Sequence, residues 1–192
     1  MTRHRLTSAA GFTLIEVLIT VTIVGVLLSM SLLVLPGAIA AAKADSGSSQ
    51  LSALLRTARE QAVTERRNVE VRFVPPDAVE AWREDIDANG AQIGQTLVQQ
   101  VFIGERMELR RFIELPDTPD GFSAGATAVE FTGAAPWSFT SEGTLVDANG
   151  DVVNGTVFLG RPFEPLSARA VTLFGPTALL REWQWNGRAW TE

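Results

Sequence analysis

A single carboxylate interrupts an otherwise uncharged apolar stretch near the start of the chain. Glu16 is the only charged residue between Phe12 and Leu35, a run of 24 residues. A lone acid in an apolar membrane environment costs about 2.5–3.5 kcal/mol on insertion scales, and a nearby cation relieves that penalty. The residue types therefore leave open what offsets the cost of Glu16. One explanation is a carboxylate that snorkels to the membrane surface.

The apolar run has the dimensions of a membrane span. As a helix, Phe12–Leu35 would extend about 36 Å, against a hydrocarbon core of about 30 Å. Arg3 and Arg5 precede it, and basic flanks stay in the cytoplasm. We therefore expect a single pass through the inner membrane, with the rest of the chain in the periplasm. An ordinary signal peptide cleaved near residues 38–40 or 42–44 is an alternative, but it leaves Glu16 unexplained.

The residues around Glu16 carry a family resemblance. The short basic leader, the segment Gly11-Phe12-Thr13-Leu14-Ile15-Glu16 and the long apolar run resemble the processing site of type IV pilins and type II secretion pseudopilins. The resemblance implies that residues 1–11 are a leader, that a peptidase cleaves after Gly11, and that Phe12 is then N-methylated. It also implies that Glu16 meets the α-amino group of a neighbouring subunit, which is largely protonated near neutral pH. Glu16 is thus predicted to be an assembly residue.

Catalytic and cofactor chemistry finds little support in the sequence. The chain has no cysteine and one histidine, His4, which excludes thiolate metal sites, cysteine nucleophiles and histidine-based triads. It contains no phosphate-binding glycine loop. We therefore expect a protein that is not an enzyme and needs no cofactor. The net charge of −6 argues against non-specific nucleic-acid binding as the main task.

Two acidic segments have residue types that bind cations or form turns. Asp85, Asp87 and Asn89 match the first half of an EF-hand loop, but Thr96 stands at the twelfth position, where that loop needs glutamate. The sequence Asp-Ala-Asn-Gly recurs at residues 147–150. The same residue types are favoured in tight turns. We predict turns at both places, with calcium binding as the alternative and Asp85, Asp87 and Asn89 as its candidate ligands.

Arginine and tryptophan are interleaved near the C-terminus. Trp183, Trp185 and Trp190 lie close in sequence to Arg181 and Arg188. Aromatic side chains between cations can stack on single-stranded nucleic acid, so DNA contact through the two arginines is one hypothesis. The simpler hypothesis is a terminal strand whose tryptophans face the core or a neighbouring subunit. A second basic cluster is expected on a solvated strand face: Arg106, Arg110 and Arg111.

Residues 36–67 are predicted to continue the apolar helix as an amphipathic one. Pro36 and Gly37 weaken the helix at the junction, where either a kink or a break is allowed. Farther along, apolar residues recur at helical spacing on one face. They are Leu51, Leu54, Leu55, Ala58 and Ala62. This stripe predicts packing against a sheet.

Strand signals dominate residues 68–192, the predicted globular head. Alternation and turn residues predict seven strands: Val69–Val74, Thr96–Ile103, Glu108–Phe112, Ala128–Phe131, Gly155–Leu159, Ala170–Phe174 and Leu180–Trp185. A helix followed by antiparallel strands is an α+β fold. The junction LRTAREQAVTERRNVEVRF and the closing hairpins resemble the GspH/FimT branch of pilin-like proteins, which implies a pilin-like fold. The insert Pro75–Asn89 fits no pattern of that branch.

These two resemblances imply a minor pseudopilin, a structural subunit of a type II secretion pseudopilus that supports protein export. Its partners would be other pilins or pseudopilins, bound through the N-terminal helix, the prepilin peptidase and methyltransferase, and inner-membrane lipid. One alternative is a FimT-like minor pilin of a type IV pilus that binds DNA for uptake. A more distant alternative is a secreted soluble binding domain with an ordinary signal peptide.

Overall fold

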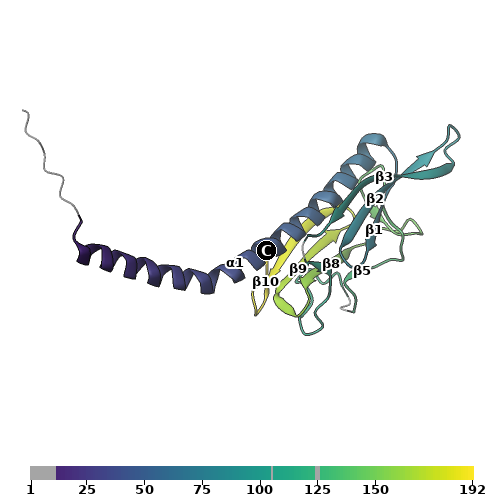
Figure 1. Ribbon diagram of the computed structural model, residues 1–192. Helices are drawn as coiled ribbons and strands as arrows, with labels where there is room; N and C mark the ends of the chain where they lie inside the picture. Colours follow the sequence, from purple (N-terminus) through teal and green to yellow (C-terminus); the bar gives the residue numbers. More distant parts are fainter. Residues whose placement is uncertain (1–11, 105, 124–125) are drawn as a thin grey trace, which may run out of the picture. The chain divides into compact units, whose positions relative to one another are not determined.

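The computed structural model describes residues 12–192 except 105 and 124–125. One long helix, α1 (Leu14–Glu65), precedes eleven short and medium strands in this part of the chain (Figure 1). Contacts divide the protein into two compact units, Met1–Ile39 and Ala40–Glu192. Among the described residues, no helix combines the length and the apolar character needed to cross a membrane.

The second part of α1, from Ala40 to Glu65, packs its predicted stripe into the core. All five stripe residues are at most 2% exposed, and Ala44 joins them. The helix is not broken at Pro36, because α1 is continuous through it. Gly47 also lies within the helix, and the lack of a side chain lets the backbone of Ile103 approach, since a Cβ there would lie 2.8 Å from the Ile103 oxygen.

The helix ends with a left-handed residue. Arg66 has φ 52°, and the Arg67 N–H donates to the Ala62 carbonyl at 3.1 Å. A bond that spans five residues behind a left-handed position satisfies a carbonyl that the helix end would otherwise leave unpaired. This turn leads directly into the first strand, which begins at Val69 as predicted.

Five strands form the first antiparallel sheet, in the order β3-β2-β1-β6-β7. Their bounds are β1 Val69–Val74, β2 Ala78–Ile86, β3 Gln92–Phe102, β6 Trp137–Phe139 and β7 Leu145–Val146. The β2–β3 hairpin is the longest pairing of this sheet and projects from it, as Figure 1 shows. Two register shifts in that hairpin, after Ala81 and after Asp85, increase its twist.

The second sheet is also antiparallel and runs β11-β10-β9-β8-β4, with β5 pairing β8 as well. Its strands are β4 Glu108–Leu109, β5 Val129–Phe131, β8 Gly155–Arg161, β9 Glu164–Phe174, β10 Leu179–Trp185 and β11 Trp190–Thr191. The central pair β8 and β9 is buried along most of its length. Strands buried on both faces need apolar or small residues at successive positions, which is what β8 supplies.

Two apolar clusters lie on opposite faces of the second sheet. Val157 and Leu159 belong to the larger cluster, which also contains the α1 stripe and residues of the first sheet. Phe158, between them in sequence, belongs to a smaller cluster with the C-terminal tryptophans. Successive side chains of a strand point to opposite faces, so β8 separates the two cores. The larger core holds the helix against both sheets.

The predicted α+β fold, a long N-terminal helix followed by antiparallel strands, is confirmed, and each of the seven predicted strands overlaps an observed one. Four observed strands were not predicted: β2, β6, β7 and β11. The insert that fitted no pattern contains β2, whose outer half is rich in charge. Arg83 pairs there with Asp85 at 2.9 Å and with Glu65 at 2.6 Å. The sequence does not predict this strand because its outer half shows no alternating apolar pattern. Its charged side chains pair with one another on a solvent-facing surface instead.

A polar network covers the outer face of the first sheet. The Glu70 carboxylate accepts hydrogen bonds from Arg72 Nε at 2.6 Å and from Gln95 Nε2 at 2.6 Å. The Arg72 guanidinium lies 5.0 Å from the centre of the Trp82 ring. The hydrogen bond from Arg72 is the main cause that lowers the pKa of Glu70, and the bond from Gln95 adds to it, while burial opposes both.

Glu70→Gln is expected to reduce the pH dependence of stability. Because the pKa of Glu70 is lower in the folded state, its ionised form stabilises the fold above the ordinary carboxyl pKa, and this contribution disappears as pH falls through the folded-state pKa. The variant should lose about 1 kcal/mol at pH 7 and much less at pH 3. Urea unfolding of the full chain in detergent, followed by tryptophan fluorescence, measures this. Equal losses at both pH values would contradict it, and the exposed Glu142→Gln serves as control.

Candidate assembly and contact sites

The first turn of α1 holds the predicted assembly residue. The Glu16 N–H donates to Thr13 Oγ1 at 3.3 Å, immediately before the helix begins at Leu14. Thr13 is therefore the N-cap, and Glu16 occupies the third helical position. A threonine cap followed three residues later by glutamate is a capping-box sequence. The predicted leader, residues 1–11 with Gly11, lies outside the described residues.

Glu16 thus has a local role that the sequence interpretation missed, although the Thr-x-x-Glu spacing signals it. A negative charge in the first turn also interacts favourably with the helix dipole, by about 0.3–1 kcal/mol. This is smaller than the cost of an unpaired carboxylate in an apolar environment. Capping therefore does not replace the need for a cationic partner once the segment is surrounded by apolar groups.

The surface around Glu16 is apolar on all sides. The thirteen large apolar side chains between Phe12 and Met30 are at least 49% exposed in this structure. The hydroxyls of Thr20 and Thr22 donate to the carbonyls of Glu16 and Leu18, four residues earlier. These two hydroxyls are therefore satisfied within the helix, and the apolar surface around them is suited to lipid or to other apolar helices.

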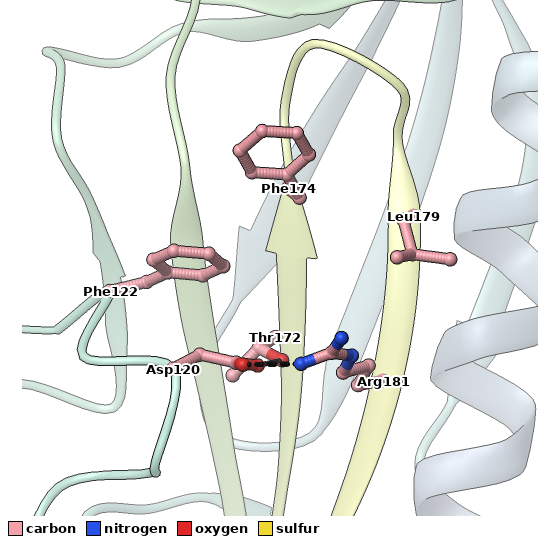
Figure 2. Close-up of a pocket in the computed structure, with 6 residues that line it drawn as sticks. All are labelled: Asp120, Phe122, Thr172, Phe174, Leu179 and Arg181. Atoms are coloured by element: carbon pink, nitrogen blue, oxygen red, sulfur yellow. Dashed lines mark hydrogen bonds and ion pairs between the residues drawn. The ribbon is translucent and has the colours of Figure 1, made fainter.

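A hollow of about 270 Å³ lies on the outer face of the second sheet. Figure 2 shows Phe122 and Phe174 on one side and Leu179 on the other. The two phenyl rings are stacked, with centroids 6.2 Å apart. At the base, Arg181 donates to Asp120 at 2.8 Å, the contact drawn as a dashed line in Figure 2. The hollow is mainly apolar, with one ion pair at its base.

Asp120 organises the base of this hollow. Its carboxylate accepts from the Thr172 hydroxyl as well as from Arg181. The Trp183 Nε1–H donates to Thr172 Oγ1 at 3.0 Å and is 3.3 Å from Asp120 Oδ2. The Asp120 side chain is 10% exposed, so it satisfies three donors in a largely buried position. No sequence signal distinguished Asp120, because its partners lie more than fifty residues away.

These contacts bear on the DNA hypothesis. Trp183, Trp185 and Trp190 are all less than 10% exposed, and the rings of Trp185 and Trp190 meet edge to face at 5.5 Å. The simpler interpretation, a strand with tryptophans in the core, is confirmed. The indoles are not available for stacking on bases, and Arg181 is held by Asp120. Arg188 is not on the same strand as Arg181 but in the turn between β10 and β11.

The second basic cluster is not the solvated strand face that we expected. The Arg111 guanidinium lies 4.0 Å from the centre of the Phe158 ring and donates to the Leu115 carbonyl at 3.3 Å. Arg110 pairs with Glu108 at 3.0 Å. Arg111 instead helps to cover the smaller apolar cluster, because a guanidinium can stack on an aromatic face and keep its hydrogen bonds at the edge.

The two Asp-Ala-Asn-Gly segments form the same turn, as predicted. Asp87 Oδ1 accepts hydrogen bonds from the N–H groups of Asn89 and Ala91. In the same way, Asp147 Oδ1 accepts hydrogen bonds from the N–H groups of Asn149 and Asp151. The glycines that follow, Gly90 and Gly150, have φ of 84° and 86°. Hydrogen bonds from Ala91 and Asn89 lower the pKa of Asp87. At Asp147 burial raises the pKa, but the turn N–H groups lower it more.

In the calcium alternative, the ligands would be Asp85, Asp87 and Asn89, which lie in the first of these turns or next to it. Asp85 is 2.6 Å from the Thr96 hydroxyl and 2.9 Å from Arg83 Nη2. Asp87 is occupied by the N–H groups of its own turn, and Asn89 Nδ2 points to Asp87 Oδ2 at 3.4 Å. Among the described residues there is no group of three or more His, Cys, Asp or Glu side chains placed to hold a metal ion.

A buried arginine connects α1 to the second sheet. Arg169 in β9 is 2% exposed, and its Nε donates to Asp45 at 2.7 Å. Its other nitrogens reach the carbonyls of Ala168 at 3.0 Å and Ala41 at 3.5 Å. Such a buried guanidinium needs every one of these acceptors. The contact fixes which end of β9 lies beside the start of the Ala40–Glu65 helix.

Comparison with known protein families identifies the head. The model of the type II transport protein GspH matches residues 48–177, more than half of the chain. The chain belongs to the GspH family. The prokaryotic N-terminal methylation motif matches residues 6–32, which contain Phe12 and Glu16. GspH-family proteins are structural pilin-like subunits, and they assemble with other pilin-like subunits into the membrane-anchored periplasmic pseudopilus of type II secretion.

Solved structures of pilin-like proteins are similar to this GspH-family chain at low identity. The minor pseudopilin EpsH from the type 2 secretion system of Vibrio cholerae is 15% identical, with a TM-score of 0.44, covering 72% of this chain and 94% of that one. The type IV minor pilin FimU of Pseudomonas aeruginosa is 14% identical in one crystal form, with a TM-score of 0.45, covering 77% and 92%. No curated protein sequence matches the chain.

Proposed function

We propose that this chain is a minor pseudopilin that is cleaved after Gly11, N-methylated on Phe12 and assembled into a type II secretion pseudopilus through its apolar helix. The observation that carries the proposal is the presence of both matches on one chain, the methylation motif over residues 6–32 and GspH over residues 48–177. A processed N-terminal helix and a folded head are the two parts that such a subunit needs. The protein acts as a structural component and not as a catalyst.

Glu16 is the residue to which we assign assembly. Its side chain lies in the first helical turn, four residues after the amine that cleavage would create on Phe12. In a bundle of apolar helices, the attraction between this carboxylate and the amine of an adjoining subunit is poorly screened. Pairing would relieve the cost of the isolated acid and set the axial stagger between neighbours.

We place the subunit in the inner membrane before it assembles. The support is the 24-residue run Phe12–Leu35, which holds one charge and follows the basic residues Arg3 and Arg5. The run would cross once, with the N-terminus in the cytoplasm and the head in the periplasm. The prepilin peptidase and methyltransferase, and bilayer lipid, are then the partners of the unassembled subunit.

The mature N-terminus tests the proposed processing. In the native host, mass spectrometry of the membrane-bound protein should find a first residue of N-methylated Phe12, because the peptidase acts before assembly. Gly11→Val should retain the leader and remain in the membrane. A soluble protein whose chain begins near Ala41–Asp45 would instead support an ordinary signal peptide and overturn the proposal.

The choice between a secretion pseudopilus and a type IV pilus depends on which function fails without the protein. We expect deletion to impair protein export and to leave pilus-dependent motility and DNA uptake unchanged. The reverse pattern would favour the minor pilin. The buried positions of Trp183, Trp185 and Trp190 give the DNA-uptake alternative no stacking surface on this strand.

A further inference from the structure

We propose that the β8–β9 turn of the head touches the lipid bilayer, with Phe163 and Leu166 as its apolar anchors. The proposal rests on the membrane anchoring proposed above. The turn joins Arg161 to Glu164. Phe163 is 95% exposed and Leu166 is 67% exposed, so two large apolar side chains three residues apart are presented to the surroundings.

The conformation of Phe163 is not explained by packing within the head. Phe163 has φ 64° and follows Pro162. Proline followed by a residue with positive φ matches a type II turn, in which glycine is the favoured second residue. A bulky side chain is uncommon in this region of backbone conformation. Phenylalanine therefore occupies a backbone position that favours glycine, although its ring packs on nothing in the head. Contact with an apolar partner outside the chain would explain why a large apolar side chain is present there.

The direction of β9 places this turn at one end of the head. Arg169 in β9 contacts Asp45 and Ala41, at the start of the Ala40–Glu65 helix. The other end of β9 leads to Thr177 and Ala178, which line a hollow together with Arg56, Arg59 and Glu60 of the helix. Strand β9 therefore runs along the helix, and the β8–β9 turn lies at the Ala40 end of this unit, where the chain enters the head.

The opposite end of the head carries the β2–β3 turn. Arg83 of β2 pairs with Glu65, the last residue of α1, and residues 87–91 extend farther in the same direction. Figure 1 shows the β2–β3 hairpin and the connection of β8 to β9 at opposite ends of the Ala40–Glu192 unit. The two turns therefore form a matched pair within this unit, one at the Ala40 end of its helix and one at the Glu65 end.

The charges around the turn are compatible with a lipid surface. The Glu164 carboxylate is neutralised by Arg161 at 2.8 Å. The β10–β11 turn lies alongside, since a Cβ at Gly187 would be 3.4 Å from Leu166 Cδ2. Arg188 follows directly and is exposed. A guanidinium beside apolar side chains suits the boundary between phosphate headgroups and acyl chains.

Fluorescence quenching in nanodiscs tests the contact on the full chain. The chain has no cysteine, so single cysteines can carry an environment-sensitive dye. Labels are placed at Pro165→Cys beside the turn, at Ala88→Cys in the β2–β3 turn and at Val26→Cys in the apolar run. Nanodiscs of phosphatidylethanolamine and phosphatidylglycerol contain lipids with a nitroxide either near the headgroup or in mid-chain. We expect the headgroup nitroxide to quench the label at residue 165 but not that at residue 88.

Two further variants test the anchors. Phe163→Ser with Leu166→Ser should abolish quenching at residue 165, whereas Ile93→Ser, which removes a side chain 70% exposed at the far end, should leave it unchanged. Quenching at residue 26 without quenching at residue 165 would overturn the lipid contact while the anchoring stands. Quenching at residue 165 that survives the double substitution would overturn the role of the two side chains. No quenching at residue 26 would refute the anchoring and the contact with it.

Discussion

Replacing Glu16 with leucine should remove the protein from filaments while leaving it in the membrane. The substitution removes a charge from the apolar run, so insertion becomes easier. It also removes the group that would pair with the Phe12 amine of a neighbour. If pairing recovers most of the 2.5–3.5 kcal/mol penalty, incorporation should fall on the order of a hundredfold. Quantitative immunoblotting of sheared pseudopili against the membrane fraction, in cells that overproduce the major subunit, measures the ratio.

A second variant separates assembly from helix capping. Thr13→Ala removes the Oγ1 that accepts the Glu16 N–H and should destabilise the first turn by about 1 kcal/mol. It leaves the carboxylate in place, so incorporation should decrease far less than in Glu16→Leu. Equal losses in both variants would mean that Glu16 acts through the capping turn. Undiminished incorporation of Glu16→Leu would refute the assembly role altogether.

The sequence predicts the elements whose signal is local. The α1 stripe from Leu51 to Ala62 follows from apolar spacing alone, and β1 was predicted with its observed bounds because it alternates cleanly. Both Asp-Ala-Asn-Gly turns follow from residues that satisfy their own backbone. In each case the signal that decides the prediction lies in residues that are near one another in sequence.

The parts that were missed depend on distant contacts. Arg169 meets Asp45 across 124 positions, and Arg181 meets Asp120 across 61. Neither pairing leaves a pattern in one sequence, because each residue type also occurs as an ordinary exposed charge. Arg111 was assigned to a solvated face for the same reason. The two-residue strands β7 and β11 are too short to show alternation and exist because a longer strand lies beside them.

Gly175→Ala should be among the most destabilising substitutions of a single methyl group in the head. Gly175 lies at the seam between the sheets, where its carbonyl accepts from the Leu145 N–H at 3.0 Å and its own N–H donates to Asn154 Oδ1 at 2.9 Å. A Cβ there would lie 2.0 Å from the backbone oxygen of Val153 and 3.2 Å from that of Leu145. Both obstacles are backbone atoms of neighbouring segments, so no side-chain rotation relieves the clash.

The expected loss is about 3 kcal/mol or more, the upper part of the range for overpacked sites. It should appear as a lower urea midpoint for the full chain in detergent, followed by tryptophan fluorescence. Gly94→Ala is the matched control, because it lies in β3 and a Cβ there meets nothing within 4 Å. The control should change stability by no more than about 0.5 kcal/mol. If both variants unfold at the wild-type midpoint, the two sheets do not approach each other at Gly175 as closely as the structure requires. The close contact between Gly175 and the backbone of Val153 would then be wrong.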